Sequence, residues 1–401
     1  MINLEKLLEN FEENIKSLVL RGVNNNSINY LKEKFLEKKR LINVLNKLRR
    51  EHNKNEKKSF SEEAKKLKNE IKNYEEKFKI VSKELNKIHE KMPNITSSSV
   101  SLENKIVKTK SFDNKLNNSL NYEDIIKKIG IVDFKSSAKI SGSKFVIYNE
   151  KGTKLINSLI NFMLSENNKN GYSLLTVPCI VNKRSLYNTG QLPKFSEDIF
   201  NIENTNFALI PTAEVSLINI YSNEIIKEEN LPIKLCSYTP CFRAEVGSAG
   251  KENSSLIRLH QFNKVELVKI TKPEDSYKEL EFLVEDACKI LEKLEITYRV
   301  VNLSFSELGI SSAKTYDIEL WMPNSKKWTE ISSCSNCEEF QSNRSKIRGK
   351  IKGKNITLHT LNGSSLAIDR LVAAILEYYY NEKNNEIDIP NNLKLFFNIF
   401  N

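Results

Sequence analysis

Charged and aromatic residues alternate along two segments in the second half of the chain. Successive side chains of an extended chain point to opposite faces, so Arg243 and Glu245 would share one face of a strand. In the segment 256–270, one face would carry Arg258, His260, Phe262, Lys264 and Glu266. A polar strand face is typical of plain exposure to solvent, but an aromatic ring among carboxylates and cations favours a binding site. We therefore predict two strands that line a site and are joined by a loop containing Gly247–Gly250.

The cysteines could support a second kind of chemistry, because Cys334 and Cys337 form a CxxC pair. A zinc site needs two further ligands at suitable spacing. The chain has only four histidines to supply them, His52, His89, His260 and His359. Six cysteines in 401 residues do not form the framework of a small disulfide-rich protein. We therefore expect structural thiols, no structural zinc and a reducing, cytoplasmic location.

Length and composition indicate a folded protein of two or three domains, at roughly 150 residues per domain. Hydrophobic residues make up 39% of the chain and charged residues 28%. The longest apolar helical stretch is interrupted by Asp369 and Arg370, so the sequence predicts no membrane-spanning segment. Residues 1–6 include acidic side chains instead of an apolar run, so no secretory signal is expected.

The positive charge of the chain is concentrated near its N-terminus. The net charge is +11, and residues 31–92 hold 20 Lys and Arg against 11 Asp and Glu. Apolar residues in this region recur at alternating spacings of three and four, which is the pattern of a coiled-coil seam. One seam contains Ile28, Leu31, Phe35, Ile42 and Leu45, and the other contains Ala64, Leu67, Ile71, Tyr74, Phe78, Val81, Leu85, Ile88 and Met92.

The polar segment 52–61 between the two seams predicts a turn, and residues 61–63 are typical of a helix start. We therefore expect an antiparallel helical hairpin over about residues 28–92, ended by Pro93. A basic hairpin favours a polyanionic partner, most commonly a nucleic acid, bound in a salt-dependent way. A coiled coil that dimerises the protein is the alternative that the seam pattern leaves open.

The remaining chain is expected to contain mixed helices and strands. Residues 94–121 are rich in Ser, Asn and Lys and indicate a linker. Strands are predicted over 174–181 and 296–301, and Pro178 places the first of them at an edge or an interface, because proline lacks the N–H for a central ladder. Apolar periodicity predicts helices over 4–20, 152–166, 274–294 and 366–380.

Five segments resemble, in the same order, the motifs of seryl-tRNA synthetase, a family of class II aminoacyl-tRNA synthetases. They are Pro178–Phe195 (motif 1 and its sequel), Pro211–Glu214 (the serine-binding TAE element), Cys241–Glu266 (motif 2 with its loop), Glu330–Cys337 (EISSCSNC) and Leu361–Arg370 (motif 3). With the basic arm in front, the resemblance covers nearly the whole chain. It implies an α+β fold, in which an N-terminal antiparallel helical coiled-coil arm precedes a class II synthetase catalytic domain on an antiparallel β-sheet.

The resemblance also implies domains, an activity and partners. Residues 1–100 would form a tRNA-binding domain that includes the arm, 101–121 a linker, and 122–401 the catalytic domain. The expected activity is that of a serine–tRNA ligase, which makes seryl-adenylate from L-serine and ATP with Mg²⁺ and transfers it to the 3′ end of tRNA(Ser). A homodimer in the cytoplasm, without membrane association, is expected, and the charging of tRNA(Sec) as well is left open.

Site residues follow from the same resemblance. Negative charge builds up on phosphate oxygens during adenylate formation, and arginine can hold two oxygens at once. The expected catalytic residues are Arg243, Glu330 and Arg370. The expected ATP-binding residues are Arg243, Ala244, Glu245, Phe262, Glu330, Ile331, Ser332, Ser333 and Arg370. Serine would be bound by Thr212, Ala213, Glu214, Arg243, Glu266 and Ser364, and Mg²⁺ by the hard oxygen ligands of Glu330 and Ser333.

The chain departs from the family in the loop of motif 2. There Ser254 and Ser255 replace a common arginine and glycine, and Lys251 stands where arginine is common. This loop is expected to contact ATP and the acceptor end of tRNA, so its weaker charge bears on the rate of transfer. Two other functions share parts of the pattern. An amino acid:carrier-protein ligase would lack the arm, and a non-catalytic RNA-binding paralogue would have lost its ATP-binding residues.

Overall fold

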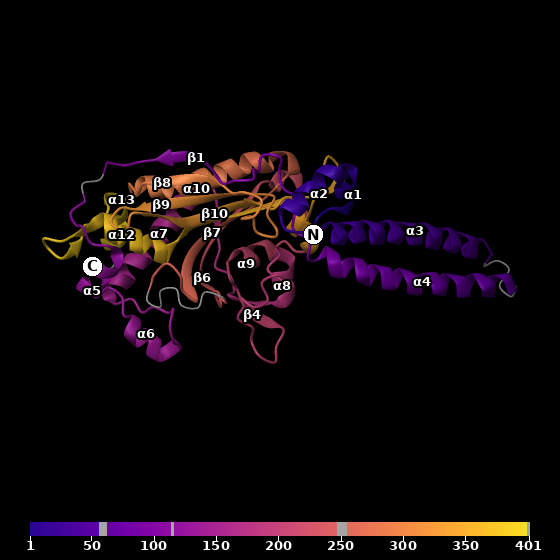
Figure 1. Cartoon of the computed structure of the whole chain (residues 1–401), viewed down its shortest axis with the longest axis horizontal. Helices are drawn as coiled ribbons and strands as arrows, with labels where there is room; N and C mark the ends of the chain where they lie inside the picture. The colour runs from indigo at the N-terminus through magenta and orange to yellow at the C-terminus, as the bar shows by residue number, and fades with distance from the viewer. Residues whose placement is uncertain (56–61, 114–115, 247–254, 399–401) are drawn as a thin grey trace. The chain divides into compact units, whose positions relative to one another are not determined.

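The structure is a computed structural model, and its elements are drawn in Figure 1. It describes residues 1–55, 62–113, 116–246 and 255–398. The predicted features outside the described residues are the helix start at Ser61, the side chain of Ala64, the loop glycines Gly247 and Gly250, and Lys251 and Ser254. Within the described ranges, every helix is too short or too polar to cross a lipid bilayer. The chain divides into two compact units, Met1–Ile95 and Thr96–Asn401.

The first unit is dominated by a hairpin of two long helices, α3 (Asn25–Asn55) and α4 (Glu62–His89). The helices run antiparallel, because Lys34 near the start of α3 forms an ion pair with Glu84 near the end of α4. Further along α3, Arg49 pairs with Glu75, which lies earlier in α4. The predicted antiparallel coiled-coil arm is therefore confirmed.

Within the described residues, the apolar seam between these helices departs from the predicted one in α3. Ile28, Leu31, Leu45, Val81 and Leu85 are buried as predicted. Ile42 is instead 38% exposed, and Leu48 continues the buried seam after Leu45. The physical reason is that an α-helix has 3.6 residues per turn, so a strict repeat of 3.5 drifts around its surface.

The single helix predicted over residues 4–20 is two helices, α1 (Leu4–Glu9) and α2 (Phe11–Leu20). Asn10 lies between them with φ −123° and ψ 56°, outside the helical region, and so interrupts the hydrogen-bond ladder. The side-chain oxygen of Asn3 caps α1 by accepting from the first free backbone N–H groups.

The second unit is built on an eight-stranded sheet with the order β1-β8-β9-β10-β13-β7-β6-β2. All neighbouring strands are antiparallel except β2 and β6, which confirms the predicted antiparallel sheet. The strands are β1 (Lys105–Lys110), β2 (Ser173–Leu174), β6 (Ile233–Phe242), β7 (Gln261–Thr271), β8 (Tyr298–Asn302), β9 (Lys314–Met322), β10 (Lys327–Asn336) and β13 (His359–Ala367).

Three predictions for this unit need correction. The expected linker contains β1, whose side chains are all exposed, so that no buried face marked it as a strand in the sequence. The strand predicted over 174–181 is interrupted, because Leu174 ends β2 and β3 begins only at Ile180, with Pro178 between them. The strand predicted over 256–270 begins at Gln261.

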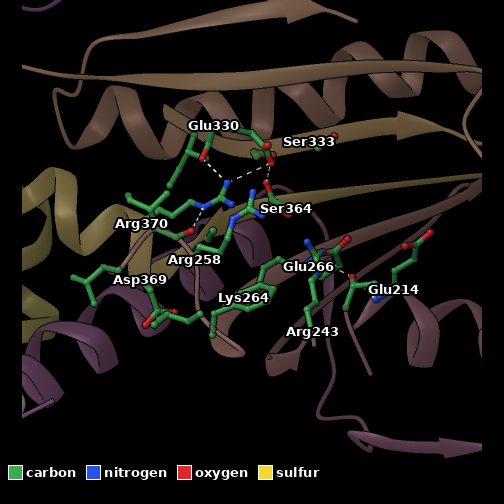
Figure 2. A pocket seen from close by; sticks show the side chains of 18 of the residues that line it. Glu214, Arg243, Arg258, Lys264, Glu266, Glu330, Ser333, Ser364, Asp369 and Arg370 are labelled. Atoms are coloured by element: carbon green, nitrogen blue, oxygen red, sulfur yellow. Dashed lines mark hydrogen bonds and ion pairs between the residues drawn. The ribbon is translucent and has the colours of Figure 1, made fainter. Parts of the chain in front are cut away.

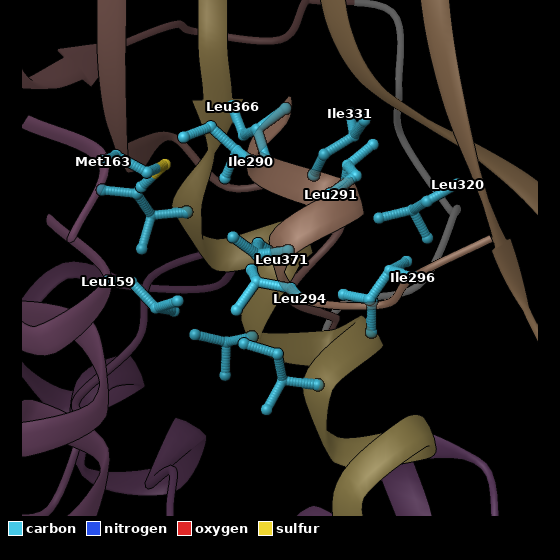
Figure 3. Close-up of a cluster of buried hydrophobic side chains, with 14 of the residues drawn as sticks. Leu159, Met163, Ile290, Leu291, Leu294, Ile296, Leu320, Ile331, Leu366 and Leu371 are labelled. Atoms are coloured by element: carbon cyan, nitrogen blue, oxygen red, sulfur yellow. The ribbon is translucent and has the colours of Figure 1, made fainter. Parts of the chain in front are cut away.

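Three helices cover one face of the sheet and form the main core, part of which is shown in Figure 3. They are α7 (Glu150–Lys169), α10 (Ser276–Lys293) and α12 (Ile368–Tyr379), close to the predicted ranges. Gly363 in β13 allows α10 to approach, because a Cβ there would lie 2.3 Å from Cδ2 of Leu283. The opposite face of β7, β13 and β10 is left free to carry polar side chains.

Shorter elements complete the second unit. Its other helices are α5 (Tyr122–Ile129), α6 (Phe134–Ser141), α8 (Lys183–Thr189), α9 (Glu214–Asn219), α11 (Phe340–Ser345) and α13 (Asn391–Phe397). Its other strands are β3 (Ile180–Asn182), β4 (Phe207–Leu209), β5 (Ile225–Lys227), β11 (Arg348–Ile351), β12 (Lys354–Thr357), β14 (Tyr380–Asn381) and β15 (Glu386–Ile387).

Two strands of the large sheet are irregular at the same level. The register of β10 shifts between Glu330 and Ser332, and that of β13 shifts between Ser364 and Ala367. Leu366, inside the second irregularity, has φ +90°, a costly conformation for a residue with a side chain. Bulges of this kind re-aim the neighbouring side chains, and they occur preferentially beside functional sites.

Candidate active site

A cavity of about 320 Å³ lies over the free face of the sheet (Figure 2). Ala213 and Ala244 are not among its described lining residues. Ala213 packs in an apolar cluster with Leu217, and the backbone N–H of Ala244 donates to the carbonyl oxygen of Asp198. The other predicted site residues all line the cavity: Thr212, Glu214, Arg243, Glu245, Phe262, Glu266, Glu330, Ile331, Ser332, Ser333, Ser364 and Arg370.

Side chains of β7 point alternately to the two faces of the sheet, and those on one face form the floor of the cavity. Val265 and Leu267 point into the core, whereas Phe262, Lys264 and Glu266 face the cavity, as the sequence predicted. His260 precedes β7 and is not part of the described lining. Its ring lies against Phe145 and Phe200, and its Nδ1 donates to the carbonyl oxygen of Arg243. His260 therefore supports the backbone of Arg243 instead of facing a ligand.

The inner end of the cavity combines buried acids with a buried cation. Nζ of Lys264 lies 2.5 Å from Oε2 of Glu266 and donates to Oγ1 of Thr212 at 2.9 Å. Glu214 is also buried, and its Oε1 accepts from Asn362 at 2.8 Å and from Gln341 at 2.6 Å. This end can bind a small molecule that carries a positive charge and hydrogen-bonding groups.

Burial and the neighbouring charge of Glu266 raise the pKa of Glu214 to about 7. The amide donors of Gln341 and the positive charges of Lys264 and Arg243 act in the opposite direction, but they do not outweigh the loss of water. Glu214 can therefore gain or lose a proton near neutral pH, which makes its charge sensitive to what binds beside it.

Arg243 links the inner end of the cavity to its aromatic wall. Its guanidinium carbon lies 5.2 Å from the centre of the Phe262 ring, and its Nε donates to the carbonyl oxygen of Pro211 at 3.4 Å. A cation over an aromatic face is held in place without losing its remaining donors. Those donors are available for the oxygens of a carboxylate or a phosphate.

The outer end of the cavity holds two more arginines. Nη1 of Arg370 donates to the carbonyl oxygen of Glu330 at 2.8 Å and lies 3.4 Å from its carboxylate. Arg258 forms an ion pair with Glu245 at 3.1 Å. Each arginine is thus oriented by a carboxylate, as Figure 2 shows for Arg370 and Glu330.

Arg370 is positioned through its neighbour in α12. The carboxylate of Asp369 accepts from the hydroxyl of Tyr148 at 2.7 Å and from the backbone N–H of Asn263 at 2.6 Å. Asp369 therefore ties the start of α12 to β7 and to the segment before α7. Burial raises the pKa of Asp369, while these donors lower it.

Side chains with hard oxygen atoms lie opposite one another on β9 and β10. Asp317 pairs with Ser333 across the two strands, and Glu330 pairs with Glu319. Burial, together with the charge of Glu330, raises the pKa of Asp317 to about 7. Oδ1 of Asp317 is buried without a hydrogen-bond partner among the described residues. Hard oxygens and an unpaired buried acceptor fit Mg²⁺, so Glu330 and Ser333 suit the metal expected from the sequence.

The paired cysteines are buried thiols. Cys334 lies in β10 and Cys337 follows that strand, and both are inaccessible to solvent. Burial raises the pKa of Cys337 to about 12, and its sulfur accepts from Asn362. Among the described residues, no group of three or more His, Cys, Asp or Glu side chains is arranged to hold a metal ion.

Ser255, one of the departures from the family pattern, lies in the core. It is buried, and its Oγ lies 2.8 Å from the hydroxyl of Tyr122. Further described residues line the cavity without having had a predicted site role, although all of them lie inside the recognised motifs: Gln191, Leu256, Ile257, Arg258, Leu259, Lys264, Asn362, Ala367 and Asp369. Their position in those segments is the signal that could have identified them.

Comparisons with known proteins agree with this geometry. The family described as "tRNA synthetase class II core domain (G, H, P, S and T)" matches residues 197–379. A serine–tRNA ligase of Desulforapulum autotrophicum is 50% identical over 73% of this chain and 69% of its own length. One of Ureaplasma parvum is 49% identical over 75% of this chain and 74% of its own length.

Solved structures agree as well. The seryl-tRNA synthetase of Pyrococcus horikoshii, complexed with ATP, is similar with a TM-score of 0.90 and 28% identity, covering 99% of this chain and 98% of that one. The cytoplasmic enzyme of Naegleria fowleri, in complex with AMP, has a TM-score of 0.87 and 25% identity, covering 97% and 94%. This chain therefore belongs to the serine–tRNA ligase family of class II aminoacyl-tRNA synthetases.

Proposed function

We propose that this serine–tRNA ligase works in two steps. The serine carboxylate first attacks the α-phosphorus of ATP and pyrophosphate leaves, and the terminal ribose hydroxyl of tRNA(Ser) then attacks the seryl-adenylate. The observation that supports this best is the single cavity that joins a buried acidic end to an end with arginines. Serine would occupy the first end and the triphosphate the second.

At the inner end, the substrate would meet complementary charges. Glu214 and Glu266 would receive the ammonium group of serine, and Thr212 and Ser364 would hydrogen-bond its polar groups. Arg243 would hold the carboxylate together with the α-phosphate, which brings the two reacting atoms into contact. A buried site built for a hydroxyl disfavours alanine, because its polar groups would stay unpaired.

At the outer end, ATP would be held by stacking and by fixed cations. Phe262 would stack on adenine, with Glu245 accepting from its amino group. Arg370 would hold the far phosphates and stabilise the leaving pyrophosphate. Glu330 and Ser333 would hold Mg²⁺, which when bound neutralises phosphate charge.

The helical arm is the proposed tRNA-binding element, within an N-terminal domain that precedes the catalytic domain. Its hairpin carries most of the net positive charge of the chain. The cations that it exposes include Lys47, Arg50, Lys68, Lys72 and Lys79. Exposed cations along a rigid hairpin suit an RNA backbone, whose binding would weaken as salt concentration rises.

A homodimer is proposed from the apolar surface around motif 1. Leu174, Ile180 and Phe207 are exposed large hydrophobic residues, and a groove nearby is lined by Ile220 and Ile225. Exposed apolar patches of this kind are typical of protein interfaces. The six cysteines are all free thiols, which agrees with a reducing, cytoplasmic location.

The test is ATP–pyrophosphate exchange with serine, threonine, alanine and cysteine, followed by charging of tRNA(Ser) and tRNA(Sec) transcripts. We expect exchange with serine well above that with the other amino acids, and charging of tRNA(Ser). The same enzyme is also assayed with an acceptor carrier protein. Pyrophosphate exchange without tRNA charging, together with transfer of the amino acid to the carrier protein, would favour the carrier-protein ligase instead. Absence of exchange with every amino acid would favour the non-catalytic paralogue.

A further inference from the structure

The serine end of the cavity contains a cation, Lys264, that has no role in the proposed contacts with serine or ATP. Its side chain is only 8% exposed. It contacts two of the proposed serine ligands at once, because its Nζ lies 2.5 Å from Oε2 of Glu266 and 2.9 Å from Oγ1 of Thr212. Lys264 therefore lines the cavity and contacts two of the proposed serine-binding side chains directly.

We propose that Lys264 is a positioning residue for serine: its ammonium holds Glu266 and Thr212 in the orientation that receives the substrate. The inference rests on the proposed serine-binding roles of these two residues. A carboxylate on a long side chain has several rotamers, and fixing it before the substrate arrives lowers the entropic cost of binding. Through its ion pair with Glu266 and its hydrogen bond to Thr212, Nζ of Lys264 holds both side chains in one orientation.

The charges in the pocket also require such a residue. Glu214 and Glu266 are both buried and face the same small space, where two negative charges repel each other. A buried carboxylate without a partner is costly, whereas a paired one is tolerated. Lys264 offsets the negative charge of Glu266, so both carboxylates can face the pocket and receive the serine ammonium.

A second buried lysine on β7 provides a matched comparison. Nζ of Lys269 lies 2.7 Å from the carboxylate of Glu279 in α10, and its side chain is fully buried. This pair lies on the helix-covered face of the sheet and outside the described lining of the cavity. β7 therefore carries two buried Lys–Glu pairs, one beside the proposed substrate and one that only joins helix to strand.

The titration of Glu214 gives a readout that a purely structural role would not change. The charged or titratable groups around Glu214 are Glu266 and Lys264 from β7, Arg243 after β6 and Cys337 after β10. The charge of Lys264 lowers the pKa of Glu214. Removing that charge should therefore move the pH dependence of serine binding to higher pH.

The experiment measures serine-dependent pyrophosphate exchange by the full-length enzyme between about pH 6 and pH 9, a range that brackets the titration. Lys264→Met and Lys264→Gln are compared with Lys269→Met. We expect both Lys264 variants to raise the KM for serine about tenfold or more, the usual effect of losing a charged hydrogen bond. The KM for ATP should stay within about twofold, and the inflection of the serine profile should move to higher pH.

Lys264→Gln removes the charge but keeps a polar side chain near Glu266 and Thr212, so it disturbs the buried pocket less than Lys264→Met. The comparison therefore remains possible if Lys264→Met does not fold. Lys269→Met should lower the melting temperature while leaving the KM for serine unchanged. The proposal is overturned by an unchanged KM for serine in the Lys264 variants, or by an equal rise in the KM for ATP. Wild-type enzyme that shows no exchange with serine would contradict the proposed function itself, which is a different outcome.

Discussion

Arg370 and Glu330 contact each other across the outer end of the cavity, although they lie 40 positions apart in the sequence. The arginine reaches both the carboxylate of Glu330, at 3.4 Å, and its backbone carbonyl oxygen, at 2.8 Å. The first residue is the proposed ligand of the far phosphates and the second a proposed ligand of Mg²⁺. In the proposed function, a metal-bound phosphate chain would therefore contact both residues at once, and the two residues would act as one unit.

Arg243→Ala should abolish serine-dependent pyrophosphate exchange. The substitution removes the only proposed contact shared by the two reacting groups, and losses of about 10² to 10³ in rate are usual for one such donor. Arg243→Lys keeps the charge but loses the fork, so it should retain part of the activity. Normal exchange in Arg243→Ala would refute the role of this residue.

Glu330→Gln should raise the Mg²⁺ concentration needed for half-maximal exchange by about tenfold or more, because a neutral amide is a poorer ligand for a hard cation. Glu319→Gln is the matched control. Glu319 pairs with Glu330 across the strands but forms its ion pair with Arg299. An identical Mg²⁺ dependence in the two variants would argue against Glu330 as a metal ligand.

The KM for serine should depend on pH through Glu214. Its pKa is raised to about 7, so the carboxylate is protonated below that value and cannot pair with the ammonium of serine. The KM should therefore rise as pH falls below about 7, by up to about tenfold per pH unit, and level off above it. Steady-state exchange at a series of pH values measures this, and Glu214→Gln should give a high KM that does not vary with pH. A flat wild-type profile from about pH 6 to pH 8 would contradict the assignment.

Deleting Leu31–Met92 should spare adenylate formation and remove tRNA charging. The residues of the cavity all lie in the second compact unit, whereas the deleted helices belong to the first. Pyrophosphate exchange and aminoacylation measured on the same preparation separate the two steps. In the full-length enzyme, the KM for tRNA should increase steeply with salt. Unchanged charging after the deletion would count against the arm as the RNA-binding element.

Gly363→Ala should destabilise the catalytic unit by about 1–3 kcal/mol, because it overpacks a filled core. The added Cβ would lie 2.3 Å from Cδ2 of Leu283 and 2.7 Å from Sγ of Cys334. Gly309→Ala is the control, since its nearest neighbour would be Oγ of Ser312 at 3.5 Å. Chemical denaturation measures the free energy of unfolding of both variants. Equal values would show that the neighbours of Gly363 can move to accommodate the added Cβ.

Local patterns were enough to predict the arm and the polar face of β7. A coiled-coil seam and a strand alternation depend on residues close together in sequence, so each can be recognised without knowing the fold. The motif segments likewise contained the twelve predicted site residues that line the cavity. The same patterns did not predict β1, because an edge strand with every side chain exposed has no apolar alternation to detect.

Only the tertiary structure decided which of these side chains meet and what charge they carry. Lys264 and Glu266 could be placed on one face from the sequence, but the contact of Lys264 with Thr212 depends on a segment 52 positions away. His260 matched the polar pattern and yet faces Phe145 and Phe200. Residue type and spacing determine local conformation, whereas burial and pKa depend on neighbours that folding brings from distant parts of the chain.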